Sequence, residues 1–578
     1  MTTSSPADPE VGDSRMVTAL VQLHQALVGA ELPFLLPGTD DLVRRRREMI
    51  DQLEDYVIPR VMTLESPMLA VVGGSTGAGK STLVNSLVGH RVTTPGVLRP
   101  TTRSPVLVHH PDDATWFGQD RLLPDLTRVD HSTDDPSCLQ LVPTTSVPQG
   151  LAILDAPDVD SVEERNRQLA AQLMQAADLW LFVTSAARYA DQVPWAFLRQ
   201  AAERSTAVAV ILDRTPDEAI QTVATHLARM LASRGLKDSP LFTVTEGKVN
   251  DDGLLPAHHV AEVRGWLESL AADTDARSVV VRQTLDGAVR TITRGSYPVA
   301  DMSDEQTDLA LQLRDEALAS YGAVNSTLAS HITDGTVVQG EVLIRWQEFI
   351  GTGELLTSLE SRVGGIRDRL VNTIKGNPQQ AERLTVAIEA GVETLLLEHG
   401  EAAAAATHAA WIERPAGVAV LAGESRDLSR ASRDLRRKAE RMVRDWQLDL
   451  LEMVRADGAD RRTSPKFLAF GVNGLSAALM VAVLARSTEE IASAALARRL
   501  LESVFGDTMA TSLIDRGQAS LTNRIDALIG DERDRYVSLV DGLALHPTAA
   551  ERLRQAARRV DDLRYEASVK EADPGDSL

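Results

Sequence analysis

The pattern of apolar and polar positions divides the chain into regions with different predicted secondary structure. Between residues 66 and 272, short apolar runs alternate with stretches of helical periodicity. The runs are MLAVVGG, SPVLVHH, GLAILDA, DLWLFVT, AVAVILD and LFTVT. Short apolar strands that alternate with helices predict a mostly parallel sheet covered by helices on both faces. We therefore expect an α/β domain over 66–272.

Helical periodicity predominates in the rest of the chain. Upstream, LVRRRREMIDQLEDYVIPRVM repeats apolar residues at spacings of three and four, which predicts an amphipathic helix within a neck segment, 16–65. Downstream, over 273–566, the strand pattern is absent and long amphipathic helices follow one another, two of them predicted at 380–411 and 425–457. The expected architecture is an α/β domain followed by a long all-α stalk or bundle.

A glycine-rich stretch, VVGGSTGAGKSTLV, joins the first apolar run to a helical segment. Glycines let backbone N–H groups curl around a phosphate, and the helix N-terminus adds positive potential. In this Gly-x4-Gly-Lys-Ser pattern, Lys80 is expected to reach the β- and γ-phosphates and the Ser81 hydroxyl to coordinate Mg²⁺. The residues predicted to bind a nucleotide here are Gly74, Ser75, Thr76, Gly77, Ala78, Gly79, Lys80, Ser81 and Thr82.

Two later motifs supply further candidate groups for phosphate and metal. In RPTTRSP, Thr101 and Thr102 precede a predicted strand, and Thr102 is the preferred candidate for completing the Mg²⁺ shell and sensing the γ-phosphate. In LAILDAPD, Asp155 ends a predicted strand, where its carboxylate is expected to reach Mg²⁺ through water. Lys80, Thr102 and Asp155 are the candidate catalytic residues, and Ser81, Thr102 and Asp155 the candidate metal site.

These motifs together resemble those of the dynamin-like large GTPases, and particularly the bacterial dynamin-like proteins. The resemblance rests on VVGGSTGAGKSTLVNSLVG, on PTTRSP as switch I and on ILDAPD as the counterpart of an Asp-x-Pro-Gly switch II. It implies GTP as the substrate, Mg²⁺ as the cofactor, and hydrolysis coupled to rearrangement of a helical stalk. It also implies membrane remodelling or tethering, with lipid and further protein chains, identical or related, as partners.

Two departures from the family pattern affect the phosphate chemistry. Asp158 replaces the glycine that normally closes switch II, and a carboxylate there would repel phosphate unless the loop turns it outward. Gly77 stands where the family's phosphate loop has a serine that assists hydrolysis. These substitutions keep open a nucleotide-dependent scaffold that hydrolyses little.

A third departure affects base recognition. The guanine-reading motif of the family, Asn/Thr-Lys-x-Asp, falls on Asp213, Arg214, Thr215 and Pro216, so the base-pairing aspartate is missing. Asp213 and Arg214 are the candidate base-site residues, with Asp217 or backbone groups as further sources of specificity. A phosphate-loop ATPase is the other alternative, although the LSGGQ-like signature of cassette ATPases is not found.

Two segments of the helical part are candidates for membrane contact. FLAFGVNGLSAALMVAVLA, residues 467–485, carries no charge and as a helix would span about 28 Å, close to a bilayer core. The same composition suits a buried helix of a large bundle, so both interpretations stand. The second segment, 412–424, joins the two helices predicted at 380–411 and 425–457 and contains a small apolar patch.

Basic residues follow the second segment. They suit either an anionic lipid surface or ion pairs with acidic helices. The eight are Arg426, Arg430, Arg433, Arg436, Arg437, Lys438, Arg441 and Arg444.

Composition and charge limit the partners and the cellular compartment expected for this protein. The chain has 578 residues, with 60 Lys plus Arg against 82 Asp plus Glu, and its net charge of −22 argues against general binding to nucleic acid. The single cysteine, Cys138, fits a reducing compartment. The ends, 1–15 and 567–578, are polar and are expected to be tails. We expect a cytoplasmic protein, peripheral to or inserted at the inner face of the cell membrane.

Overall fold

The computed structural model divides into two compact units. It describes residues 10–34, 36–93, 104–119, 121–161, 163–351, 378–486 and 492–572. The first unit consists of Met1–Leu32, Pro37–Glu305 and Leu545–Leu578, and the second of Pro33–Leu36 and Gln306–Ala544. One of the divisions between them, at Glu305, falls within a helix, α9 (Thr274–Thr333).

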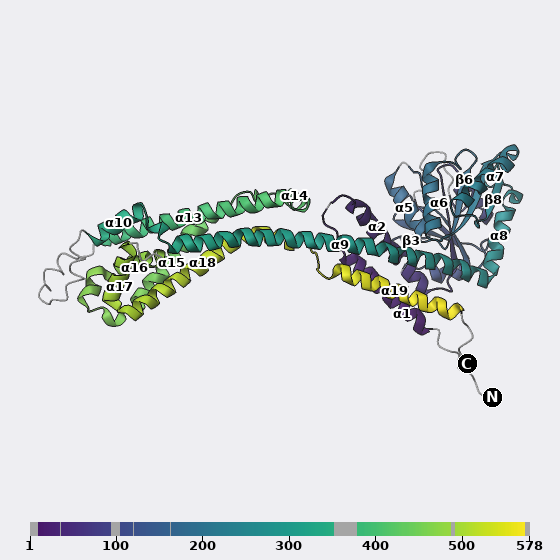
Figure 1. The fold of residues 1–578 in the computed structure, drawn as a ribbon. Helices are drawn as coiled ribbons and strands as arrows, with labels where there is room; N and C mark the ends of the chain where they lie inside the picture. The colour runs from purple at the N-terminus through teal and green to yellow at the C-terminus, as the bar shows by residue number, and fades with distance from the viewer. Residues whose placement is uncertain are drawn as a thin grey trace, which may run out of the picture. The chain divides into compact units, whose positions relative to one another are not determined.

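A single sheet forms the centre of the first unit (Figure 1). Among the described residues it has eight strands in the order β3-β4-β2-β5-β1-β6-β7-β8, and all neighbours run parallel except β2 with β5. The strands are β1 (Met68–Gly74), β2 (Val106–His109), β3 (Thr127–Val129), β4 (Cys138–Pro143), β5 (Leu151–Asp155), β6 (Leu179–Ser185), β7 (Ala207–Thr215) and β8 (Leu241–Thr245). The predicted mostly parallel sheet is confirmed.

Helices cover both faces of this sheet because side chains along each strand point alternately to opposite faces. In β1, Met68, Ala70 and Val72 enter one core, whereas Leu69 and Val71 enter the other. The first core is closed by α4 and α8, and the second by α5, α6 and α7. Their bounds are α4 (Lys80–Val88), α5 (Glu164–Gln175), α6 (Gln192–Glu203), α7 (Asp217–Ser233) and α8 (Ala261–Ala272).

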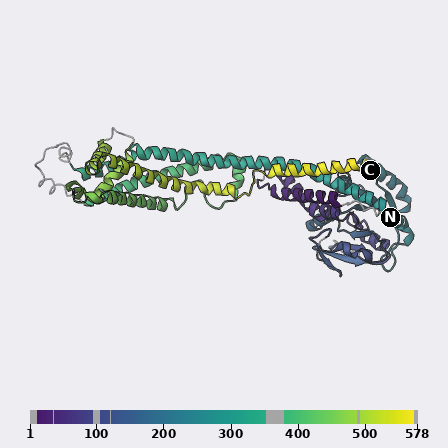
Figure 2. The same ribbon diagram turned by 90° about the horizontal axis from the view of Figure 1, so that it is seen from below.

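Further helices extend the second core of this unit. They are α1 (Glu10–Gly29), α2 (Thr39–Gln52), α3 (Ile58–Met62) and α19 (Ala549–Ala572). The amphipathic helix predicted from sequence is α2 and α3, joined through a π-helical turn, η1 (Leu53–Val57). Helices α1 and α19 lie side by side (Figure 2), and α1 begins inside the segment expected to be a tail. Segments far apart in sequence therefore share one core.

A buried ion pair fixes the start of β1 to this helical layer. Arg60 in α3 lies 2.8 Å from the carboxylate of Asp178, and neither side chain is exposed. The same carboxylate accepts hydrogen bonds from the Tyr56 hydroxyl at 2.9 Å and from the Leu69 N–H at 2.7 Å. Because every charge is paired, this cluster holds the strand that leads to the glycine-rich loop.

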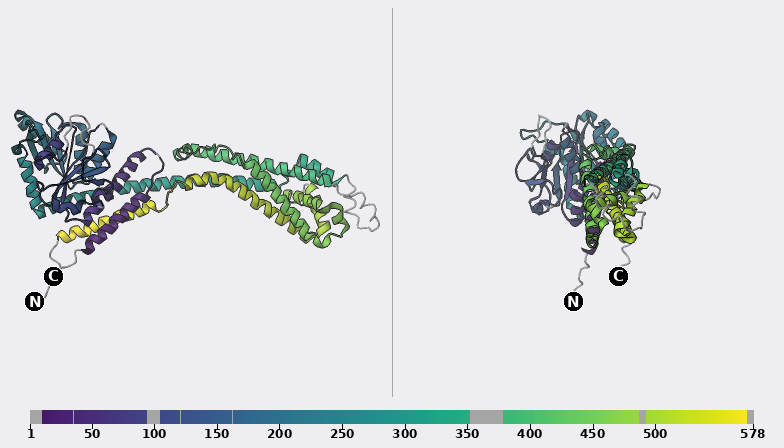
Figure 3. Two further views of the ribbon diagram at one scale, coloured as in Figure 1. Left: turned by 180° about the vertical axis from the view of Figure 1, so that it is seen from behind. Right: turned by 90° about the vertical axis from the view of Figure 1, so that its left-hand side faces the viewer.

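The second unit is all-α, as predicted (Figure 3). It contains the later part of α9 and α10 (Glu341–Ile350), α13 (Pro378–Ile412), α14 (Pro415–Ala422), α15 (Leu435–Asp457), α16 (Pro465–Leu484), α17 (Ala492–Phe505) and α18 (Asp507–Asp541). Helix α15 packs against α13, α16 and α18. Short 3₁₀ turns in the two units are η2 (Pro111–Phe117), η3 (Ala257–His259), η4 (Thr336–Val338) and η5 (Ala459–Arg461).

One predicted helix starts later than expected. The helix predicted at 425–457 begins at Leu435, and the preceding ten residues are not helical but form bends, a turn and irregular backbone. The Asp427 carboxylate accepts the Ser429 N–H at 3.0 Å and its hydroxyl at 2.6 Å. Such local hydrogen bonds between side chain and backbone compete with helix formation. The prediction did not detect them because it rested on the helical spacing of the basic residues.

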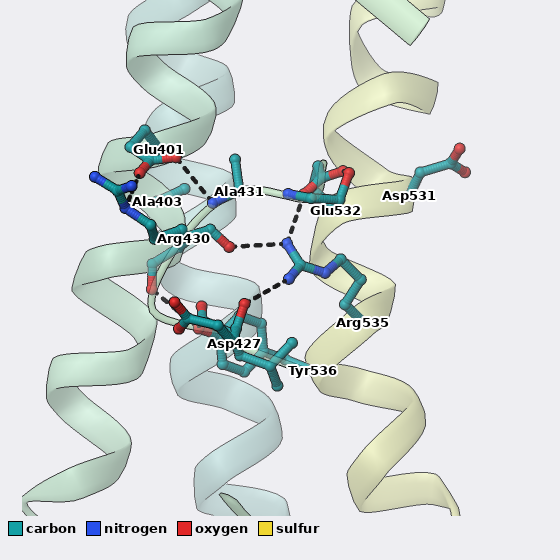
Figure 4. A network of polar contacts seen from close by, with 12 residues as sticks. Glu401, Ala403, Asp427, Arg430, Ala431, Asp531, Glu532, Arg535 and Tyr536 are labelled. Carbon is teal, nitrogen blue, oxygen red and sulfur yellow. Dashed lines mark hydrogen bonds and ion pairs between the residues drawn. The ribbon is translucent and has the colours of Figure 1, made fainter. Parts of the chain in front are cut away.

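A polar network fastens these turns to α18 (Figure 4). The Glu532 carboxylate, only 1% exposed, accepts the Ser432 N–H at 2.8 Å and pairs with Arg535 at 2.8 Å. Arg535 also donates to the backbone carbonyl of Arg430 at 3.0 Å, and Glu401 of α13 accepts the Ala431 N–H at 2.9 Å. The turn segment is therefore held between α13 and α18.

We predict that Glu532→Gln lowers the stability of the second unit by about 3 kcal/mol, because it leaves Arg535 without its buried counterion. The decrease in unfolding temperature can be measured by calorimetry on the full chain. The matched control is Asp534→Asn on the same helix, whose carboxylate pairs with Arg533 in solvent and whose loss should cost less than about 1 kcal/mol. Equal effects of the two substitutions would contradict the importance of the network.

Ion pairs also account for most of the basic residues near α15. Six of the eight contact acidic side chains. This agrees with the sequence-based interpretation that these residues form ion pairs with acidic helices. The pairs are Arg426–Glu424, Arg430–Glu401, Arg436–Glu393, Arg437–Asp434, Lys438–Asp531 and Arg444–Glu440. This arrangement favours pairing over an open lipid-binding face for these six.

The apolar segment 467–485 corresponds closely to α16. Among the described residues, Lys466–Leu484 is the one helix long and apolar enough to cross a membrane, and 67% of it is buried. Residues 475–485 except Ser476 lie in the apolar core, whereas Leu468 is 69% exposed. Gly471, at φ 64° and ψ 174°, separates the two parts by a kink. The buried part behaves as a bundle helix.

Candidate nucleotide-binding site

The glycine-rich loop lies between the carboxyl end of β1 and the start of α4, next to β5 and β6. Gly74, Gly77 and Gly79 have positive φ angles of 147°, 75° and 102°. A β-carbon at Gly74 would meet the carbonyl of Val183, and one at Gly79 would meet the carboxylate of Asp213. The loop therefore requires glycine for both its backbone conformation and its close packing.

Lys80 lies across this loop as the first residue of α4. Its side chain is 5% exposed, and its Nζ donates to the carbonyls of Gly74 at 3.0 Å and Ser75 at 3.2 Å. It also makes a close ion pair with the Asp158 carboxylate. The one cation expected to neutralise phosphate is thus occupied by groups of the protein itself.

Asp155 ends β5 directly beside β1, where it is paired in register with Val72. Its side chain is fully buried, and neither carboxylate oxygen has a hydrogen-bond partner of normal geometry within the described part of the chain. Burial raises the pKa of Asp155 to about 6, and the neighbouring Ser81 hydroxyl and Lys80 ammonium group partly oppose this shift. A buried carboxylate beside a hydroxyl group is a donor set that fits Mg²⁺.

The candidate base-site residues lie at the end of β7. Asp213 is buried against Gly79, and its carboxylate accepts the Arg214 N–H at 2.7 Å. Burial raises the pKa of Asp213 to about 6, and Arg214 opposes the shift. Arg214 is exposed and has a positive φ of 49°, while Asp217 is exposed in the first turn of α7. The structure therefore brings Asp213, but not Asp217, against the glycine-rich loop.

Most of the site residues predicted from the sequence lie together in the structure. The loop residues Gly74–Gly79, together with Lys80, Ser81 and Thr82 in the first turn of α4, gather with Asp155 and Asp213 at the carboxyl edge of the parallel strands. Thr101 and Thr102 fall outside the described residues, so the role assigned to Thr102 stays a prediction.

Sequence reasoning missed Asp160, which contacts the loop, and Arg188, which pairs with Asp160. Asp160 accepts hydrogen bonds from the Thr76 N–H at 2.5 Å and the Thr76 hydroxyl at 2.6 Å. Arg188, after β6, pairs with the other oxygen of Asp160 at 3.0 Å. The spacing of acids in DAPDVD was a signal for Asp160, because Asp158 and Asp160 both follow the strand that carries Asp155.

Comparison with known proteins finds a family model that matches the region containing the glycine-rich loop. A family model described as the dynamin family matches residues 69–213. The probable transmembrane GTPase FZO-like, chloroplastic, of Arabidopsis thaliana is 24% identical over 205 residues, which cover 34% of this chain and 21% of that protein. The conjugal transfer protein TrbB of Rhizobium radiobacter is 36% identical over 72 residues, 11% of this chain and 22% of that protein. The matches thus span about a fifth of the length of these two relatives.

Among solved structures, a chain of an oligomerised bacterial dynamin pair is similar to this one. That pair is described as providing a mechanism for the long-range sensing and tethering of membranes. The two chains are 11% identical with a TM-score of 0.37, and the similarity covers 97% of this chain and 96% of the other.

Proposed function

We propose that this chain binds GTP and hydrolyses it with the help of Mg²⁺, because a model of the dynamin family matches residues 69–213 and a relative of 24% identity is named as a GTPase. The observation that carries the proposal is the fully buried Asp155 carboxylate, placed beside the Ser81 hydroxyl and the Lys80 ammonium group at the glycine-rich loop. A phosphate loop alone would suit many nucleotides and reactions. The metal-type donor set beside it favours phosphoryl chemistry.

Each residue has a distinct part in this proposal. The N–H groups of the glycine-rich loop and the Lys80 ammonium group bind the phosphates, while Ser81 and Asp155, through water, hold Mg²⁺. When bound, the metal supplies charge that stabilises the transferring phosphoryl group. Thr102 is proposed to sense the γ-phosphate. Because Asp213 is already packed against the loop, it and Arg214 are proposed to orient guanine.

The helical unit is proposed to change conformation with the nucleotide state and to contact lipid at the inner face of the cell membrane. Exposed apolar side chains support lipid contact: Ile344 of α10 is 56% exposed and Leu468 of α16 is 69% exposed. Leu468 borders a pocket that Phe349 and Phe470 also line. We further propose assembly with other copies or related chains.

A nucleotide-dependent scaffold with little hydrolysis is the second candidate. The observation in its favour is the close ion pair between Asp158 and Lys80, together with glycine at position 77. Under this alternative the nucleotide would control assembly without rapid turnover.

Phosphate release from GTP by the full chain tests the first candidate. We predict Mg²⁺-dependent release that Asp155→Asn lowers by about a hundredfold, because the neutral amide holds the metal poorly. Asp112→Asn, which changes an exposed carboxylate, should have the wild-type rate. Unchanged hydrolysis by Asp155→Asn would contradict the assigned metal site, and binding without release would support the scaffold.

A further inference from the structure

Two carboxylates from one short segment contact groups of the glycine-rich loop that are proposed to bind phosphate. Asp158 and Asp160 follow β5 and lie three and five residues after Asp155. Asp158 pairs with the Nζ of Lys80, and Asp160 accepts the Thr76 N–H at 2.5 Å. These contacts join residues that are 78 and 84 positions apart in the sequence. The segment therefore folds back over the loop.

The chemistry of these contacts is that of a bound phosphate. A phosphate oxygen and a carboxylate oxygen both accept hydrogen bonds from ammonium and backbone N–H groups, and each does so most strongly when it is charged. Asp158 is 8% exposed and Lys80 is 5% exposed, so water screens their attraction little. A nucleotide that binds at this loop needs the same donors.

We propose that Asp158 and Asp160 are built-in competitors for the nucleotide phosphates, and that a bound nucleotide displaces both carboxylates from the loop. This inference rests on the proposed function, because it requires the nucleotide to bind at the glycine-rich loop. The apparent affinity is then the intrinsic affinity reduced by the fraction of molecules in which the loop is free.

Arg188 provides a cation that stays paired with Asp160 when Asp160 leaves the loop. Its guanidinium group pairs with Asp160 at 3.0 Å and with Asp191 at 3.5 Å, and it is partly exposed. Asp160 can therefore leave Thr76 while remaining paired with Arg188, so its departure does not strand a buried charge. Asp158 has no second cation among the described contacts, and it should be the stronger competitor.

The test compares Asp158→Asn and Asp160→Asn in the full chain. Each amide keeps the size of the side chain and removes the charge. Titrations in Mg²⁺ use GDP, a non-hydrolysable GTP analogue and inorganic tripolyphosphate. We expect Asp158→Asn to bind all three ligands about tenfold more tightly than wild type, and Asp160→Asn to gain less. Asp238→Asn, on the exposed loop before the amino end of β8, controls for net charge and should match wild type.

A second measurement separates competition from a general effect on folding. Without ligand, Asp158→Asn should unfold at a lower temperature than wild type, since Lys80 loses its counterion. With saturating GDP it should be stabilised more than wild type is. Affinity that is unchanged or weaker in Asp158→Asn, or stabilisation by GDP that does not exceed that of wild type, would overturn the proposal.

The ligands also distinguish this inference from the proposed function. If Asp158→Asn gains affinity for tripolyphosphate while neither protein prefers GTP to ATP, the competition stands and the guanine assignment fails. If wild type binds the GTP analogue specifically and Asp158→Asn gains nothing, the proposed function stands and the competition fails.

Discussion

Lys80→Ala is expected to abolish nucleotide binding, with a loss of affinity of at least about a hundredfold, while the fold remains intact. The substitution removes the ammonium group that donates to the loop carbonyls and leaves Asp158 as an unpaired negative charge beside the phosphates. Lys80 contacts two backbone carbonyls and a carboxylate, so the substitution removes polar contacts at the loop and no apolar side chain of the sheet. Fluorescence titration with a labelled guanine nucleotide measures the affinity.

Lys237→Ala is the matched control for this prediction. Lys237 is exposed on the loop between α7 and β8, at the amino end of that strand, and should bind nucleotide as wild type does. Without ligand, Lys80→Ala should unfold at a lower temperature than Lys237→Ala because Asp158 loses its cation, but both proteins should be folded at the temperature of the titration. Tight binding by a folded Lys80→Ala protein would show that the nucleotide does not bind at this loop.

Leu479→Glu is expected to unfold the second unit. Leu479 has no exposed surface in α16, and a glutamate there buries a charge among apolar neighbours, at a cost of several kcal/mol. Calorimetry should show the loss of one thermal transition. Nucleotide binding should persist, because the binding residues belong to the other compact unit.

Leu468→Glu, on the exposed side of the kink in the same helix, is the control for folding and the test for lipid contact. Since Leu468 is mostly exposed, the protein should fold normally but sediment less with anionic vesicles. If Leu479→Glu leaves the second unit folded and instead abolishes vesicle binding, residues 475–485 contact lipid rather than forming a core. That result would contradict the burial described above.

The sequence predicted the sheet because strands buried on both faces read as continuous apolar runs. All six runs are strands, and β1 is buried along its whole length. The strands β3 and β4 were missed because TRV and CLQLVP are short and only partly buried. The late start of α15 was missed because the Asp427 turn depends on local hydrogen bonds that helical periodicity does not reveal.

The site was predictable to the extent that its groups are contiguous. The glycine-rich loop and Lys80 are one segment, so their spacing shows their relation. The contacts of Asp160 with Thr76 and Arg188 join three separate segments, and only the folded chain brings them together. The pairing of Asp158 with Lys80 was likewise not predictable from the sequence, which indicated only that a carboxylate there would repel phosphate unless the loop turns it outward. For α16, composition alone does not distinguish a core helix from a membrane helix.

Calorimetric titration of the full chain with non-hydrolysable GTP and ATP analogues in Mg²⁺ tests the central claim most directly. A guanine-nucleotide site at the glycine-rich loop predicts that the GTP analogue binds at least about tenfold more tightly than the ATP analogue, and that Lys80→Ala binds neither. Equal affinity for the two analogues, or no binding of the GTP analogue to the wild-type chain, would contradict it.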